Sequence, residues 1–109
     1  MGLFSKPGGV IPAQEARQIM ERGGECVVLD VRTPAEYRRR RIKGAKLIPV
    51  DEIMSRAPRE LPDLNVPILV YCQSGIRALT AVKALTQIGY TNVASFGGIA
   101  DWPYETVRG

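Results

Sequence analysis

The stretch that most constrains the fold runs from Ile68 to Ala78, where an apolar run meets an amphipathic segment through a short polar loop. The β-branched and aromatic residues Ile68 to Tyr71 predict a strand buried on both faces, as in a parallel sheet. After the loop, apolar residues recur at the helical steps of three and four, and Gly89 supplies a stop. These helical positions are Ala78, Ala81, Val82, Leu85 and Ile88. Cys72, the first loop residue, is therefore expected between the end of a strand and the start of a helix.

This position has a chemical consequence for the Cys72 thiol. The amides of a tight loop and of a helix N-terminus converge on negative charge at their centre. Such amides, together with nearby cations, populate the thiolate, which is the reactive form of cysteine. Arg77, at the far end of the loop, adds a cation whose forked donors suit a sulfonate, sulfate or phosphate group. The loop therefore predicts an activated cysteine beside an oxyanion site.

The size and charge of the chain limit the class of function. With 109 residues it has room for one domain and one site. Its formal charge of +4 and pI near 9.4 favour anionic small molecules or acidic partners. We find no apolar stretch as long as a membrane span and no N-terminal secretory signal, so we expect no membrane partner and a cytoplasmic location.

The cysteine and histidine content excludes other chemistry. Two cysteines in a cytosolic chain are expected to stay reduced, so a disulfide between Cys26 and Cys72 is disfavoured. The chain has no histidine, and two cysteines alone do not make a Cys/His zinc site. We therefore expect no metal and no cofactor. Cys26, within an apolar run, is interpreted as a small core residue.

Apolar runs and helical segments alternate along the rest of the chain. We expect a flexible tail over residues 1–9, because Pro7-Gly8-Gly9 lacks periodicity, and a single domain over residues 10–109. Capping signals predict helices after Pro12, at Thr33-Pro34-Ala35-Glu36 and after Asp51 through Arg56, with irregular chain from Pro58 to Pro67. The expected strands are Val10-Ile11, Cys26 to Val31, Lys46 to Pro49, Ile68 to Tyr71 and Thr91 to Phe96, the last followed by a short helical turn toward Trp102.

This alternation predicts an α/β domain of three layers, with a central parallel sheet of five strands and helices on both faces. Ligands collect at the carboxyl ends of parallel strands. Cys72, Asp30 and Gly97-Gly98 all follow or end such strands, so we expect them at one edge of the sheet. We interpret Asp30 and Arg32 as residues that brace this edge, by pairing locally or with Glu36, in preference to direct catalysis.

Several segments together resemble the rhodanese family. They are Leu29-Asp30-Val31-Arg32 with Glu36-Tyr37, Ile42-Lys43-Gly44-Ala45, the loop from Cys72 to Arg77, and Gly97-Gly98-Ile99 followed by Trp102. The match covers roughly residues 10 to 103 in order and spacing. Arg40-Arg41 stands where the family commonly has Gly-His, and Ala78 where it often has serine.

The resemblance implies a single-domain sulfurtransferase in which Cys72 carries sulfur as a persulfide. The thiolate would attack the outer sulfur of a small anionic donor such as thiosulfate, and a thiol, cyanide or a protein would accept the sulfur. The amides of Gln73, Ser74, Gly75, Ile76 and Arg77 would point at the sulfur, so no histidine base is needed. Arg77 would hold the departing sulfite or the sulfonate end of the donor.

Other interpretations stay open. A non-catalytic rhodanese-like regulatory or binding module could keep the same fold. A phosphatase or arsenate reductase is less favoured, because its loop usually has one residue more between cysteine and arginine than the four found here. Tyr37 and Trp102 are interpreted as packing residues. The run from Arg38 to Arg41 with Lys43 is interpreted as a solvated helix end, with a docking surface for an acidic protein or an RNA as the alternative, although no nucleic-acid motif supports RNA.

Overall fold

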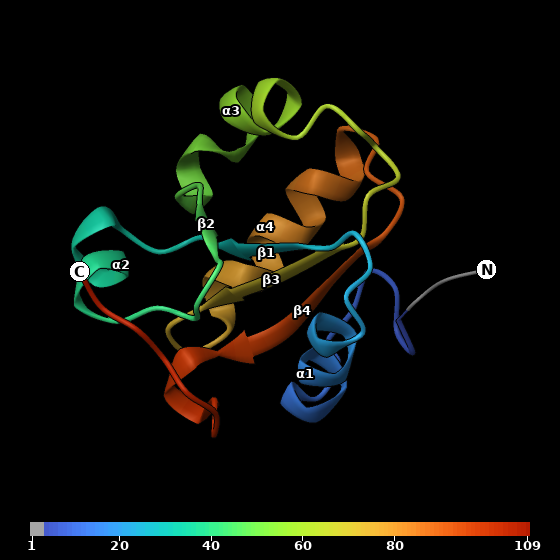
Figure 1. Cartoon of the computed structure of the whole chain (residues 1–109). Coiled ribbons are helices and arrows are strands. Elements are labelled where there is room, and N and C mark those ends of the chain that lie inside the picture. Colours follow the sequence, from blue (N-terminus) through green and yellow to red (C-terminus); the bar gives the residue numbers. More distant parts are fainter. Residues whose placement is uncertain (1–3) are drawn as a thin grey trace.

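The computed structural model describes residues 4–109. A four-stranded parallel sheet in the order β2-β1-β3-β4 forms its centre. Figure 1 shows α1 on one face of this sheet and α3 and α4 on the other, with the C-terminus beside α2. The elements are α1 (Ala13–Glu21), β1 (Val27–Asp30), α2 (Pro34–Arg39), β2 (Lys46–Leu47), η1 (Val50–Glu52), α3 (Ile53–Glu60), β3 (Ile68–Cys72), α4 (Ile76–Gln87), β4 (Val93–Gly98) and η2 (Ile99–Asp101).

The central strand β3 is buried along its whole length, as the apolar run predicts. Successive side chains of a strand point to opposite faces. Ile68, Val70 and Cys72 accordingly join the cluster beneath α3 and α4. Leu69 and Tyr71 join the cluster beneath α1. The three-layer α/β prediction is confirmed, and Cys72 lies at the carboxyl end of the central strand.

The number of strands differs from the prediction. The expected first strand, Val10-Ile11, makes a single bridge between Val10 and Ser95 at the edge of β4, so the regular sheet has four strands in place of five. The Ile11 amide donates to the Ser95 carbonyl at 2.8 Å, and the Ser95 amide donates to Gly9 at 2.9 Å. Pro12 follows directly, and a proline has no N–H to continue the ladder. The pairing therefore ends after one bridge and the chain enters α1.

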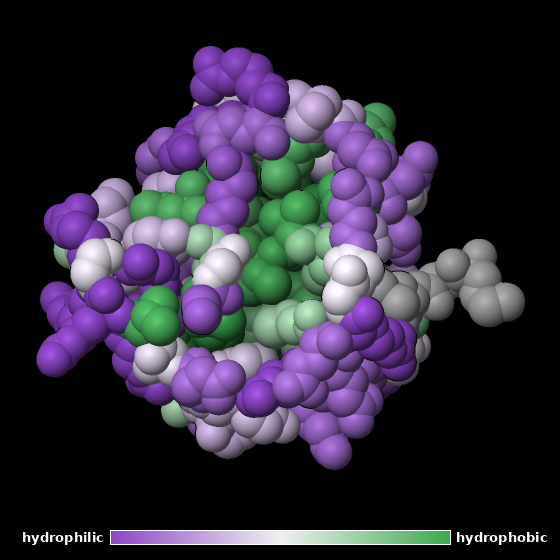
Figure 2. Space-filling model, in the orientation of Figure 1, coloured by the Kyte–Doolittle hydropathy of each residue, from purple (hydrophilic) through white to green (hydrophobic). Residues whose placement is uncertain are grey.

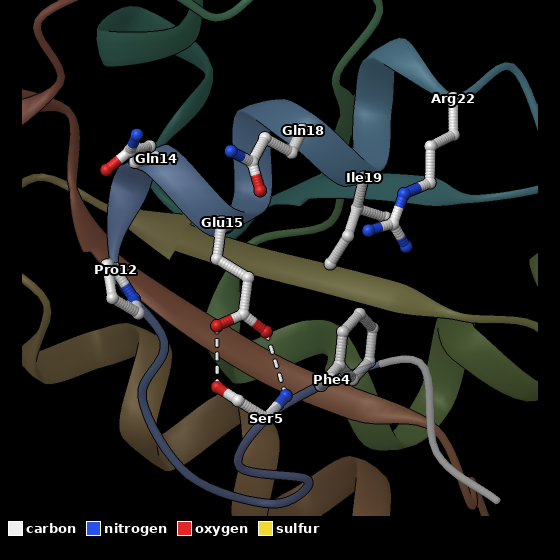
Figure 3. Close-up of a pocket in the computed structure, with 8 residues that line it drawn as sticks. All are labelled: Phe4, Ser5, Pro12, Gln14, Glu15, Gln18, Ile19 and Arg22. Carbon is white, nitrogen blue, oxygen red and sulfur yellow. Dashed lines mark hydrogen bonds between the residues drawn. The ribbon is translucent and has the colours of Figure 1, made fainter.

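Residues 1–9 were predicted to form a flexible tail, and residues 1–3 of this segment lie outside the described residues. Phe4 is buried against the α1 side of the core. Ser5 donates to the Glu15 carboxylate through its amide at 2.8 Å and its hydroxyl at 2.5 Å, and Figure 3 draws both bonds. The Gly8 amide donates to Val93 at 2.7 Å. The flexibility of this tail stays a prediction. These contacts restrain the segment from Phe4 to Gly9.

Helix α3 is longer than predicted. Pro58 lies inside it, although we expected irregular chain from that residue, and Asp51 belongs to η1 and makes no cap with its side chain. Within this helix, the Arg56 guanidinium bonds Glu52 at 3.1 Å and Glu60 at 2.7 Å, one turn to either side. The buried Ile53 and Ala57 pack α3 against the core, and this packing, with a smaller contribution from the Arg56 pairs, offsets the N–H that Pro58 lacks.

None of the helices among residues 4–109 combines the length and the apolar character that crossing a bilayer demands. Figure 2 shows apolar residues over the middle of the sheet and hydrophilic residues around them, with hydrophilic side chains projecting over α2 at the left.

Candidate active site

The Cys72 sulfur lies inside a tight loop that joins β3 to α4. Only Gln73, Ser74 and Gly75 separate Cys72 from the first residue of the helix, Ile76. Two backbone amides donate to Sγ, from Gly75 at 2.9 Å and from Ala78 at 3.3 Å. Gly75 has φ of +106°, a left-handed conformation that only glycine adopts without strain. The loop thus forms an amide cradle for a sulfur anion at the N-terminus of a helix of 12 residues.

Gly97 and Gly98, which end β4, lie against the backbone of this loop. A Cβ on Gly98 would collide with the backbone of Gln73 and Ser74, and a Cβ on Gly75 would lie 3.4 Å from the Gly97 Cα. The Ala100 amide donates to the Gln73 carbonyl at 3.2 Å. The close approach of two backbones requires glycine at position 98. The structure therefore brings Gly97-Gly98 to the Cys72 loop.

Arg77 forms a two-pronged ion pair with Glu36 of α2. Its Nη1 lies 2.8 Å from Oε1 and its Nη2 lies 2.9 Å from Oε2. The hydrogen bonds from Arg77 lower the pKa of Glu36 to about 2, and the bonds to Glu36 raise the pKa of Arg77. Glu36 also closes the predicted capping box with Thr33, accepting from its amide at 2.9 Å. The motif for the box identifies Glu36, but its second partner was not predicted.

Asp30 and Arg32 form a buried ion pair beneath the loop. The Asp30 side chain is 0% exposed and that of Arg32 is 2% exposed, and Nη2 lies 2.7 Å from Oδ2. The same guanidinium donates to the Arg40 carbonyl at 2.5 Å and to Gln73 Oε1 at 3.4 Å. Arg32 therefore connects β1, the Cys72 loop and the chain after α2. Its partner is Asp30, whereas pairing with Glu36 was one of the expected arrangements.

Tyr71 completes this network from the residue before the cysteine. Its hydroxyl donates to Asp30 Oδ2 at 2.7 Å and accepts from the Ile42 amide at 3.1 Å. Burial, and then the bond to Asp30, raises the pKa of Tyr71, so this hydroxyl stays protonated. Among the described residues no buried side-chain nitrogen or oxygen lacks a hydrogen-bond partner. The polar role of Tyr71 was not predicted, because in the sequence Tyr71 simply continues the apolar run of β3.

A cavity of about 380 Å³ opens beside this network. It is lined by Arg32, Glu36, Arg39, Arg40, Gln73 and Ile99. A larger cavity of about 570 Å³ lies against α1 (Figure 3), where Glu15 accepts both bonds from Ser5 and no cysteine lines the wall. The smaller cavity is therefore the one that adjoins the chemistry of the Cys72 loop.

The other predicted positions lie as follows. Cys72 is buried, and the Gln73 and Ser74 side chains are exposed. Ile76 is 73% exposed on the first turn of α4. Cys26 directly precedes β1 and is half-buried, and burial raises the pKa of its thiol to about 11, which opposes reactivity at neutral pH. The Ala78 amide, which the sequence analysis did not assign, is one of the two that reach the sulfur.

No group of three or more His, Cys, Asp or Glu side chains that could hold a metal occurs among residues 4–109. The site therefore consists of a cysteine, backbone amides, a paired arginine and a buried ion pair. This arrangement can stabilise a thiolate and can present cationic groups to an oxyanion.

Comparisons with known proteins agree with this fold. The family model for the rhodanese-like domain matches residues 12–104. The chain is 36% identical over 81 residues to thiosulfate sulfurtransferase PspE of Escherichia coli, covering 74% of this chain and 78% of that protein. It is 34% identical over 104 residues to thiosulfate sulfurtransferase GlpE of Pseudomonas fluorescens, covering 91% and 92%.

Among solved structures, a rhodanese with anions from E. coli superposes with a TM-score of 0.72 at 34% identity, covering 77% of this chain and 99% of that one. The family model spans nearly all of the described domain, and the two relatives match in sequence over most of their own length. This chain belongs to the rhodanese-like domain family.

Proposed function

We propose that this protein is a sulfurtransferase that moves a sulfane sulfur from an anionic donor such as thiosulfate to a thiophilic acceptor through a persulfide on Cys72. The observation that carries this proposal is the pair of amides from Gly75 and Ala78 directed at the Cys72 sulfur, inside a loop at a strand end. The curated names of PspE and GlpE support the same reaction class.

The reaction divides into two balanced steps. In the first, the Cys72 thiolate attacks the outer sulfur of thiosulfate. A bond from Sγ to that sulfur forms, the S–S bond of the donor breaks, and sulfite leaves with the electron pair. In the second, an acceptor such as cyanide or a thiolate attacks the outer sulfur of the persulfide, and Cys72 leaves as the thiolate. The amides stabilise both the thiolate and the persulfide anion, so neither step needs a histidine base.

Arg77 is the cation assigned to the donor in this scheme. Two N–H groups of its guanidinium already bond Glu36. The remaining N–H groups can bind the sulfonate end of thiosulfate or the departing sulfite. The backbone of Gln73, Ser74, Gly75 and Ile76 forms the wall around the reacting sulfur. Asp30 and Arg32 position this wall, because Arg32 reaches Gln73 from a buried ion pair.

Intact-mass measurement tests the proposal. The native protein is exposed to thiosulfate, freed of small molecules and weighed, and we expect a gain of one sulfur atom that cyanide removes as thiocyanate. Cys72→Ser should gain nothing, whereas the matched control Cys26→Ser should behave as wild type. A Cys72→Ser protein that turns over thiosulfate and cyanide at the wild-type rate would contradict the mechanism.

A non-catalytic binding module is the second candidate. It is favoured by two observations: Cys72 is fully buried, and Arg77 is held by Glu36. It predicts a folded protein that forms no persulfide with thiosulfate, mercaptopyruvate or a persulfidated protein. A phosphatase would instead hydrolyse an aryl phosphate in a Cys72-dependent manner without sulfur transfer, and the same preparations test that reaction.

A further inference from the structure

Four exposed cations follow one another closely in the chain, on α2 and just after it, and two of them line the cavity beside the Cys72 loop. They are Arg38, Arg39, Arg40 and Lys43, here called the basic surface, and within residues 4–109 none of them has a carboxylate within 4.0 Å. Five other cations of the described chain, Arg17, Arg32, Lys46, Arg56 and Arg77, pair with carboxylates. The basic surface therefore keeps its charge available for an anionic partner.

Two residues of the basic surface, Arg39 and Arg40, lie beside the Cys72 loop. Arg39 and Arg40 line the cavity that also includes Gln73 of the Cys72 loop. The Arg40 carbonyl accepts from Arg32, the guanidinium that also reaches Gln73. Glu36 of the same helix holds Arg77. A partner bound to the basic surface would therefore lie beside the residue that carries the sulfur.

The other side of the loop presents aliphatic side chains. Ile76 is 73% exposed and Leu79, one turn further along α4, is 48% exposed. The ion pair between Glu36 and Arg77 joins α2 to this end of α4, so cations and aliphatic groups flank the same loop. A protein surface can cover both kinds of group. Single-stranded RNA recognition relies on stacking against aromatic rings, and none of the exposed large hydrophobic residues is aromatic.

We propose that the basic surface docks an acidic protein whose thiol takes the sulfur from Cys72, an inference that rests on the proposed sulfurtransferase function. In the transfer, the partner thiolate attacks the outer sulfur of the Cys72 persulfide. A new S–S bond forms on the partner, the Cys72 S–S bond breaks, and Cys72 keeps the electron pair as its thiolate. The cations speed encounter with the acidic partner and stabilise its attacking thiolate.

Three peptides of equal length test the charge preference. Each has one central cysteine, flanked by Glu, Gln or Lys residues. Cys72 is first loaded with sulfur, and the rate at which each peptide removes it is followed by intact mass. We expect the Glu peptide to react roughly tenfold faster than the Lys peptide at low salt. This ratio should fall at about 1 M salt, where the screening length is about 3 Å.

Two variants of equal charge separate the basic surface from the net charge. The test variant is Arg38→Gln/Arg39→Gln/Lys43→Gln, and the control is Lys6→Gln/Arg22→Gln/Arg59→Gln, whose cations are also exposed but lie outside the basic surface. We expect the test variant to lose most of the Glu-to-Lys ratio and the control to retain it. Differences in intrinsic thiol reactivity cancel, because the same peptides are compared across the three proteins.

Each contrary result has a distinct meaning. An equal Glu-to-Lys ratio in wild type, test variant and control would overturn the docking inference, even with a persulfide that discharges normally to cyanide. A short single-stranded RNA that inhibits the Glu-peptide reaction more strongly than polyglutamate of equal charge would overturn it in favour of an RNA partner. Failure of Cys72 to load with sulfur would instead contradict the proposed function itself.

Discussion

Arg77 and Glu36 lie 41 residues apart in sequence and share two parallel bonds of 2.8 and 2.9 Å. This pair joins the helix after the Cys72 loop to α2, the short helix that carries Arg38 and Arg39 of the basic surface. It has two consequences for the enzyme. It fixes the direction of the guanidinium, and it places a carboxylate in competition with any anionic donor for that guanidinium.

We expect Glu36→Gln to lower the KM for thiosulfate about fivefold, because removing a partly exposed pair is worth about 1 kcal/mol and frees the charge of Arg77. Glutamine can still close the capping box, so α2 should persist. Steady-state kinetics at fixed cyanide measure the effect. The control is Glu60→Gln, whose carboxylate pairs with Arg56 and Lys46. A higher KM would show that Glu36 chiefly positions Arg77.

Arg77→Ala should weaken the use of thiosulfate more than it weakens folding. The loss of the guanidinium raises KM, by roughly tenfold, because the donor loses a charge-assisted contact. The double variant Glu36→Gln/Arg77→Ala removes the carboxylate that the single variant leaves unpaired. Saturation curves for thiosulfate, with unfolding midpoints for the same proteins, test this. Curves identical to wild type would exclude Arg77 from donor binding.

Stability should decrease in acid through the same pair. The pKa of Glu36 is held at about 2 by its bonds to Arg77, below the ordinary value of 4.5. A depressed pKa contributes stability that is complete above about 4.5 and is lost as pH falls toward about 2. Denaturant unfolding at several pH values in this window should give a shallower loss for Glu36→Gln than for wild type. Glu60 also has a pKa of about 2, so Glu60→Gln should make the acid loss shallower in the same pH window.

Gly98→Ala should impair both folding and sulfur loading. The new Cβ would collide with the backbone of Gln73 and Ser74, so the Cys72 loop must move. Overpacking of this kind costs about 1–3 kcal/mol. Gly24→Ala is the matched control, because nothing lies within 4 Å of its Cβ position. Unfolding midpoints and intact mass after thiosulfate measure both effects, and unchanged loading in Gly98→Ala would show that the loop can shift without loss of function.

The buried ion pair between Asp30 and Arg32 gives a fifth prediction. Asp30→Asn keeps the shape of the side chain but leaves Arg32 charged and unpaired in the interior, at a cost of about 3–5 kcal/mol. Tyr71→Phe removes only one hydroxyl from the same network and should cost about 1–2 kcal/mol. Chemical denaturation of both variants compares them. Equal losses would mean that the Asp30 charge does not hold Arg32 in place.

Local sequence patterns predicted correctly those elements whose structure depends mainly on their own residues. The apolar period predicted β3 and α4 on either side of Cys72, and the motif at Thr33 to Glu36 predicted the capping box. Local signals gave the wrong prediction at two places. Helix α3 continues through Pro58, where Ile53 and Ala57 pack against the core, and Pro12 reduces the expected strand at Val10 to one bridge. Core packing extended the helix in the first case, and the missing N–H of Pro12 ended the strand pairing in the second.

The sequence by itself determined the α/β order of elements, the family and the place of Cys72 between strand and helix, because periodicity and capping act within a few residues. Only the tertiary structure decided which groups meet there. The pairing of Arg77 with Glu36, the contact of Gly98 with Gln73 and the reach of Arg32 to Gln73 join segments far apart in the chain. Their distances depend on how the sheet and helices pack, and no local pattern encodes them.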